Sequence, residues 1–251
     1  LTPDGSTVVY RHDQDTAGVN ELYAIPVGGG ARTKISAAIP GGQSLSAFRI
    51  SPDGTRVVYS LQSGFDIVGL VSVPITGGSS NSLVSSIVSS GDIKQFEITP
   101  DSSRVVYRGD IVTDEIIEIF SIPIAGGART TVSGTSTATT MVNFNADLQL
   151  TPDSSTVVYT GDQTTDGVNE IYAAPVTGGA ITTLNSAIVS GGDVGLSSSQ
   201  FAITSDGTRV VYIADQDTND DTEIYSVAIG GGATTKLNGT LASGGDVSSF
   251  Q

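Results

Sequence analysis

One ten-residue stretch occurs five times along this chain of 251 residues. Each copy begins with Thr or Ser, continues through Pro-Asp-Gly or a close variant of it, and ends in Val-Val-Tyr and one further residue. The copies start at Thr2, Ser51, Thr99, Thr151 and Thr204, so they are 48 to 53 residues apart. This period is typical of folds assembled from repeated supersecondary units, in which each unit buries its apolar surface against its neighbours.

Each unit contains four candidate strands. In the second unit, residues 45–50 (LSAFRI) precede the turn and residues 55–60 (TRVVYS) follow it. A third strand is expected at residues 20–27 (NELYAIPV) of the first unit, and a short Thr-rich fourth strand at residues 31–36 (ARTKIS). The third strand ends at a Pro, which cannot donate to a β-ladder, and a Gly-Gly pair follows it as in a hairpin. The continuous Val-Val-Tyr run indicates a second strand that is covered on both faces.

The Pro-Asp-Gly segment predicts a tight turn between the first and second strands. Pro presets φ, Asp can accept a bond from its own backbone, and Gly accepts a positive φ. Ser102 and Ser154 stand in place of this Gly in two copies. We therefore expect that a left-handed backbone is not required there.

Units of about fifty residues with four antiparallel strands predict an all-β fold, a five-bladed β-propeller that spans residues 1–251 as a single domain. A β-solenoid would need shorter repeats.

The chain ends in SSFQ, and SSFQ followed by Leu1 repeats the pattern that precedes the other four markers. We therefore expect residues 247–251 to pair beside Val8–Tyr10 as the innermost strand of the first blade and so close the ring. If this strand entered a neighbouring molecule instead, the same sequence would form a strand-linked assembly.

The unit SPDGTRVVYS…ELYAIPVGGG…TKIS resembles the WD40-like PD40 repeat of TolB-type propellers. The resemblance covers all five units, although residues 61–74 (LQSGFDIVGLVSVP) lack the acidic loop and the Glu-Leu-Tyr of the others. It implies a propeller fold. It leaves the function open, because such propellers serve as protein-binding platforms, as domains attached to hydrolases and as parts of surface proteins. TolB itself joins a six-bladed propeller to another domain at the periplasmic side of the envelope, so its specific role is not expected for five units.

The net charge of −15 disfavours nucleic acid and anionic lipid as partners and favours cations or basic proteins. No apolar run approaches the length of a membrane-spanning helix, so we expect no membrane insertion. The absence of Cys excludes disulfides and thiol chemistry.

The loops between second and third strands are rich in Asp, as in DQDTAGVNE, GDQTTDGVNE and ADQDTNDDTE. Ca²⁺ takes six to eight oxygen ligands, which closely spaced carboxylates can supply. The candidate ligands are Asp13, Asp15, Asp162, Asp166, Asp215, Asp217 and Asp220. The full EF-hand pattern is absent. Asp, Asn and Gly also cap turns. We prefer the interpretation that these residues cap the loops. We therefore expect no cofactor and keep Ca²⁺ as the open alternative.

We expect no catalytic residues. The one His, His12, is expected in a loop, and no Gly-x-Ser-x-Gly elbow exists. A glycosidase needs two carboxylates at one pocket, but Glu97 is the only carboxylate within a predicted first strand. The side chains expected to line the central channel are Arg49, Glu97, Gln149 and Gln251. The chain also lacks Trp for sugar stacking.

These observations predict a non-catalytic binding or structural propeller module of a secreted, periplasmic or cell-surface protein. The expected partner is another protein or a further copy of the chain. Two alternatives stay open: a propeller domain of a carbohydrate-active or other hydrolytic enzyme, and a subunit of a strand-linked filament or surface assembly.

Overall fold

The computed structural model describes residues 1–134, 148–195, 201–242 and 244–250, and within these ranges it consists of strands and loops without any helix. The described part of the chain therefore offers no helix that could cross a membrane. The chain forms two compact units, one of Leu1–Glu115 with Phe120–Thr130 and one of Ile116–Ile119 with Thr131–Gln251. Five antiparallel sheets follow one another along the chain, and we call them blades 1 to 5.

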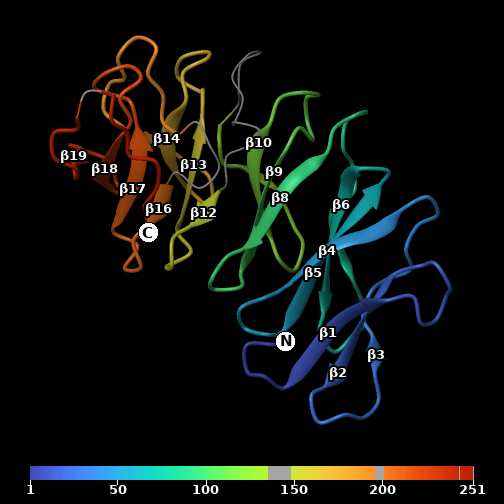
Figure 1. The fold of residues 1–251 in the computed structure, drawn as a ribbon. Helices are drawn as coiled ribbons and strands as arrows, with labels where there is room; N and C mark the ends of the chain where they lie inside the picture. Colours follow the sequence, from blue (N-terminus) through green and yellow to red (C-terminus); the bar gives the residue numbers. More distant parts are fainter. Residues whose placement is uncertain (135–147, 196–200, 243, 251) are drawn as a thin grey trace. The chain divides into compact units, whose positions relative to one another are not determined.

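Blades 1 and 2 and most of blade 3 belong to the first unit. Figure 1 colours these blades from blue to green. Blade 1 has three strands, and blades 2 and 3 have four each, hydrogen-bonded in chain order. Their strands are β1 (Thr7–His12), β2 (Glu21–Pro26) and β3 (Thr33–Lys34); β4 (Ser44–Ile50), β5 (Arg56–Ser63), β6 (Asp66–Pro74) and β7 (Asn81–Val84); β8 (Ile93–Ile98), β9 (Arg104–Gly109), β10 (Glu118–Pro123) and β11 (Thr130–Thr131).

Blades 4 and 5 belong to the second unit and have four strands each. Their strands are β12 (Gln149–Leu150), β13 (Thr156–Gly161), β14 (Glu170–Pro175) and β15 (Thr182–Thr183); β16 (Phe201–Ile203), β17 (Arg209–Ala214), β18 (Glu223–Ala228) and β19 (Thr235–Lys236). The predicted four-stranded antiparallel meander is thus confirmed in blades 2 to 5. Residues 247–250 form no strand, and Gln251 lies outside the described residues, so closure of the ring stays a prediction.

The second strand of each blade carries the core. In blade 2, Val57, Val58 and Tyr59 are at most 1% exposed, and the equivalent residues of blades 3 and 4 are buried to the same degree. Coverage on both faces, predicted from the continuous apolar run, is therefore confirmed there. In blade 1, by contrast, Val8 and Tyr10 are only half-buried, and β1 pairs with β2 alone among the described strands.

The repeated turn is held by side-chain oxygens. The Thr2 hydroxyl donates to Asp4 Oδ1 at 2.6 Å and accepts the Thr7 N–H at 3.0 Å, and Asp4 Oδ1 accepts the Ser6 N–H at 3.0 Å. The same bonds recur in the other four turns, around Asp53, Asp101, Asp153 and Asp206. This network explains why the five copies of the motif are so similar in sequence.

The expectation that a left-handed backbone is not required where Ser replaces Gly in this turn is wrong. Ser102 and Ser154 have φ of 63° and 65°, close to the 73° of Gly5. A left-handed residue other than Gly costs roughly 1–2 kcal/mol, but the surrounding hydrogen bonds impose the conformation. Ser102 also contributes its hydroxyl, which accepts the N–H of Asp53 from the preceding turn at 2.9 Å.

Candidate functional site

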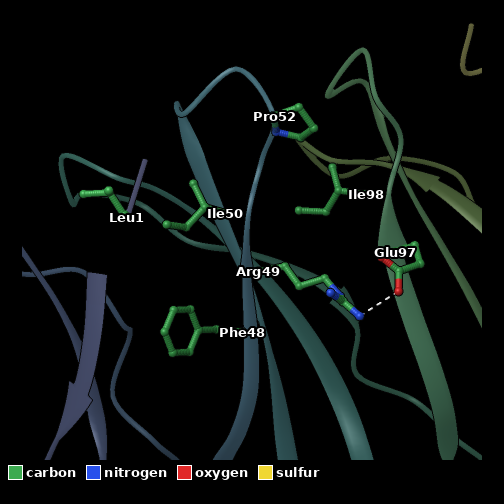
Figure 2. Close-up of a pocket in the computed structure, with 7 residues that line it drawn as sticks. All are labelled: Leu1, Phe48, Arg49, Ile50, Pro52, Glu97 and Ile98. Carbon is green, nitrogen blue, oxygen red and sulfur yellow. Dashed lines mark hydrogen bonds and ion pairs between the residues drawn. The ribbon is translucent and has the colours of Figure 1, made fainter. Parts of the chain in front are cut away.

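A pocket of about 460 Å³ lies beside the first strands of blades 2 and 3. Figure 2 shows its lining residues, which are Leu1, Phe48, Arg49, Ile50, Pro52, Glu97 and Ile98. Within it, Arg49 Nη2 donates to Glu97 Oε1 at 2.6 Å, and Arg49 Nε donates to the Phe96 carbonyl at 3.1 Å. The guanidinium also lies 5.7 Å from the centroid of the Phe96 ring. The positive charge of Arg49 is therefore neutralised by Glu97, which lies on the first strand of the next blade.

Gln149 occupies the position of Arg49 in blade 4 and makes an equivalent connection. Its Nε2 donates to the Phe201 carbonyl at 2.8 Å, and its Oε1 accepts the Ile203 N–H at 3.2 Å. One amide side chain thus continues the β-ladder to the first strand of blade 5. Two of the residues expected to line a channel, Arg49 and Gln149, therefore connect consecutive blades. Sequence reasoning missed this role, and its only signal is a Gln or Arg just before the Ile or Leu that precedes the turn. Whether these side chains face a central channel stays a prediction.

In blades 1, 3, 4 and 5, the loop that follows the second strand is capped by its first Asp. The carboxylate of Asp13 accepts the N–H of Gly18, five residues later, at 3.0 Å. That residue has a positive φ of 77°. The same bond recurs in blades 3, 4 and 5, at Asp110 with Glu115, Asp162 with Gly167 and Asp215 with Asp220, at 3.1 to 3.4 Å. The bond from Gly18 lowers the pKa of Asp13. These carboxylates shape the loops, in agreement with the turn-capping interpretation.

In blades 3 and 5 this Asp also holds the segment that precedes the first strand. Asp110 Oδ1 accepts the N–H of Asp92 at 2.7 Å, and Asp215 Oδ1 accepts the N–H of Asp193 at 2.5 Å. Asp193 in turn accepts the N–H of Asn169 from blade 4 at 2.5 Å. Burial raises the pKa of Asp92 and of Asp193, and the neighbouring carboxylate adds to the increase in both.

The other candidate calcium ligands have separate surroundings. Asp15 pairs with Arg32 at 2.6 Å, which lowers the pKa of this carboxyl. Asp217 pairs with Lys236 at 3.1 Å. Asp220 accepts a bond from Asn219, and Asp166 is exposed. The described ranges contain no group of three or more His, Cys, Asp or Glu side chains arranged to hold a metal ion. Calcium binding stays the open alternative to the expectation of no cofactor.

A group of side chains, which we call the aromatic–acid cluster, lies at the start of the third strand in blades 1, 4 and 5 and in part in blade 3. In blade 1, Tyr23 donates its hydroxyl to Glu21 at 2.9 Å, and Lys34 forms an ion pair with the same carboxylate. The Tyr23 ring stacks on Tyr10, with centroids 5.5 Å apart. Blades 4 and 5 repeat the Tyr–Glu bond, and blades 3, 4 and 5 repeat the stacked pair. Glu21 therefore pairs with a basic residue of its own blade.

His12 ends strand β1 rather than lying in a loop. Its side chain is 60% exposed, and its Nδ1 lies 3.2 Å from Asp13 Oδ1. An imidazole this open to water lacks the enclosed surroundings in which acid–base catalysis is usually found.

No protein-family model matches the chain, and no curated protein matches it. Among solved structures, an oligogalacturonate lyase in complex with manganese is 14% identical, with a TM-score of 0.57, over 96% of this chain and 64% of that chain. A structure from a study of two prolyl endopeptidases is 15% identical, with a TM-score of 0.58, over 92% of this chain and 35% of that one. A putative TolB from Agrobacterium tumefaciens is 19% identical, with a TM-score of 0.49, over 94% and 78% of the two chains.

The blades and the likeness to the first two structures agree with the resemblance read from the repeat. The chain has a TolB-like β-propeller fold. At these identities the likeness concerns the fold alone. The chain spans less than two thirds of the lyase and about a third of the endopeptidase, so the activities of those proteins do not carry over.

Proposed function

We propose that this chain is a non-catalytic propeller module that binds a protein partner or builds a larger structure in an exported or cell-surface protein. The observation that carries the proposal is the ion pair between Arg49 and Glu97, which occupies the Glu97 carboxylate. Glu97, the only carboxylate that lines the first-strand pocket, is bound to Arg49 at 2.6 Å. Glycoside hydrolysis needs an acid and a second carboxylate about 5 to 9.5 Å apart across the substrate. Glu97 faces a guanidinium instead, so it is used to connect blades.

The loops between second and third strands in the first unit offer a surface for a protein partner. Phe65, at the tip of the β5–β6 hairpin, is 100% exposed, and Val112, in the β9–β10 loop, is 46% exposed. Loops carry a disproportionate share of binding residues, so we propose these two side chains as contact points for a partner. The net charge of −15 favours a basic partner.

The proposal includes two further features of the fold, the single domain and the closure of the ring. We expect residues 1–251 to act as one domain, with residues 247–251 pairing along β1 to complete blade 1. Among the described strands, the inner edge of β1 lacks a neighbour, whereas the second strands of the other blades each have one. Deletion of residues 247–251 should lower the melting temperature. An unchanged melting temperature would contradict closure. A wild-type protein that forms a concentration-dependent oligomer, and becomes monomeric when residues 247–251 are deleted, would indicate that the strand inserts into another molecule.

The enzyme alternative rests on structural neighbours that include a lyase and endopeptidases. The test is a panel of chromogenic glycosides, esters and peptides, together with an oligogalacturonide, assayed with the wild type, Glu97→Gln and His12→Ala. We expect no turnover by any of the three. Turnover that one substitution abolishes would refute the non-catalytic proposal.

A further inference from the structure

The fourth strand of blade 5 is followed closely by an Asn whose side chain caps the third strand. Asn238 Oδ1 accepts the N–H of Ile224 at 3.0 Å, and in blade 4 Asn185 Oδ1 accepts the N–H of Ile171 at 2.9 Å. Blades 1 and 3 use a Ser hydroxyl for the same bond. The position therefore requires a side-chain acceptor, and blades 4 and 5 supply it from an amide.

Both Asn side chains also fold forward over the peptide unit that follows them. Asn238 Nδ2 donates to the carbonyl of the next residue, Gly239, at 2.9 Å, and Asn185 Nδ2 donates to the carbonyl of Ser186 at 2.9 Å. Each bond keeps the side-chain amide carbon over the following peptide unit instead of turned away from it. From this arrangement the peptide nitrogen can attack the side-chain carbonyl, because groups that are held close together react far faster than free ones.

The residue that follows the Asn distinguishes the two sites. Ser186 is held by its hydroxyl, which lies 2.7 Å from the hydroxyl of Thr234 in blade 5. Gly239 is exposed, and a Cβ built on it would meet no atom within 4 Å. Because Gly has no Cβ and the widest backbone freedom, its peptide nitrogen can approach the Asn238 amide carbon without a side chain in the way.

A pocket of about 480 Å³ adjoins Asn238 and Gly239. Its lining also includes Glu223 and Lys236, and Lys236 Nζ lies 2.5 Å from Glu223 Oε2. A polar pocket of this volume has room for water. Water can therefore reach the Asn238 side chain, and a small leaving group can diffuse away from it.

We infer that Asn238 is a self-modification site, at which the chain converts its own amide into a carboxylate. The peptide nitrogen of Gly239 loses its proton and forms a bond to Asn238 Cγ, the bond from Cγ to Nδ2 breaks, and Nδ2 leaves as ammonia. Water then opens the resulting cyclic imide at either of its two carbonyl carbons. One opening gives Asp and the other gives isoaspartate, so the net reaction consumes one water and releases one ammonia. The inference does not depend on the proposed binding function.

Either product changes the surroundings of the cap. The new carboxylate keeps an acceptor for the capped N–H but loses the Nδ2 donor, and it places a negative charge beside the Gly239 carbonyl and the buried Glu223. Isoaspartate also lengthens the backbone by one methylene. The segment that follows is attached to blade 5 at Thr222, whose N–H donates to Asp246 at 2.8 Å and whose carbonyl accepts the N–H of Val247 at 2.9 Å. The modification should therefore loosen the segment that leads out of blade 5.

The test follows both Asn residues by peptide mapping and mass spectrometry while the full chain is incubated at mildly alkaline pH in water labelled with heavy oxygen. Trypsin cleaves after Lys236 and releases residues 237–251, in which Asn238 is the only Asn. We expect Asp and isoaspartate at this position, each with one heavy oxygen atom, at a rate at least tenfold above that of Asn185. Gly239→Ser copies blade 4 and should lower the rate at Asn238 at least tenfold. Ser186→Gly is the matched reciprocal variant and should raise the rate at Asn185.

A synthetic peptide of residues 237–251 provides the reference without a fold. We expect the native chain to react at a rate within tenfold of this peptide, because the fold keeps the reacting groups together. A native rate more than tenfold below that of the peptide would overturn the inference, since the fold would then protect Asn238. Equal rates at Asn185 and Asn238 would overturn it as well, and so would an unchanged rate in Gly239→Ser.

The effect on blade 5 is measured with two further variants. Asn238→Asp places the carboxylate at the site directly and should lower the melting temperature. Asn238→Ser is the matched control, because it keeps a hydroxyl acceptor as in blades 1 and 3 and cannot form the imide. Equal melting temperatures of the two variants would refute the predicted loosening.

Discussion

Replacing Gln149 by Ala should test whether one side chain per blade joins consecutive first strands. The substitution removes the bond to the Phe201 carbonyl at 2.8 Å and the bond from the Ile203 N–H at 3.2 Å. Each such bond contributes about 1 kcal/mol net, and a backbone group left without a partner adds to the loss. We expect the free energy of unfolding to fall by about 2 kcal/mol. For a chain of this size that corresponds to roughly 4–8 °C in melting temperature.

The matched control is Gln62→Ala. Gln62 makes a local bond to the Gly64 carbonyl at 2.6 Å in an exposed hairpin. Its loss should cost about 0.5 kcal/mol or less. Thermal melts and urea unfolding of the two variants and the wild type provide the comparison. A Gln149→Ala protein as stable as the Gln62→Ala protein would show that the connection between blades 4 and 5 does not depend on this amide.

Three further predictions follow from the Asp residues. Asp215→Ala should lower the free energy of unfolding by about 2–3 kcal/mol, because the N–H groups of Asp193 and Asp220 lose their acceptor, whereas the exposed Asp166→Ala should change it by at most about 0.5 kcal/mol in the same urea titration. The turn hydroxyls of Thr151 and its equivalents lower the pKa of Asp153, Asp4 and Asp206 below the ordinary 3.8, so their contribution is complete above pH 4 and is lost as the pH falls through the lowered values. Melts between pH 2 and 6 should show a smaller acid loss in Asp153→Asn than in the wild type, and equal slopes would contradict this cause. Melting curves in excess Ca²⁺ and in chelator should superimpose, whereas a bound ion at a hundredfold excess over its dissociation constant would add about 2.7 kcal/mol.

The features predicted correctly from the sequence are local and periodic. Thr2 and Asp4 lie two residues apart and close the turn together. The residues that stabilise this turn are therefore all within the repeated motif, so the turn can be predicted from it. The Val-Val-Tyr run specifies a strand that is covered on both faces, and β5 has that environment. Pro ends β2, β6, β10 and β14, as its missing N–H requires.

The features that sequence reasoning missed depend on contacts between separate segments. Gln149 and Phe201 are 52 residues apart, and nothing near either residue indicates that a side-chain amide extends a β-ladder. Ser102 takes a left-handed backbone because Asp101 and Thr99 impose the turn, which outweighs the intrinsic preference of Ser. Glu21 finds its Lys in the fourth strand of its own blade, and a Glu at the start of a strand does not by itself specify which basic residue lies opposite.

A chain that writes one unit five times provides an internal comparison for each of its blades. Positions that all blades share, such as the turn Asp, serve stability, because the energy of a repeat protein is nearly a sum over repeats and interfaces. One blade can then lose a stabilising cluster without unfolding the whole. Blade 2 has done so: Gly69 lies at the position that Glu21 has in blade 1, and Val71 lies opposite Tyr59 where blade 1 has the stacked ring of Tyr23.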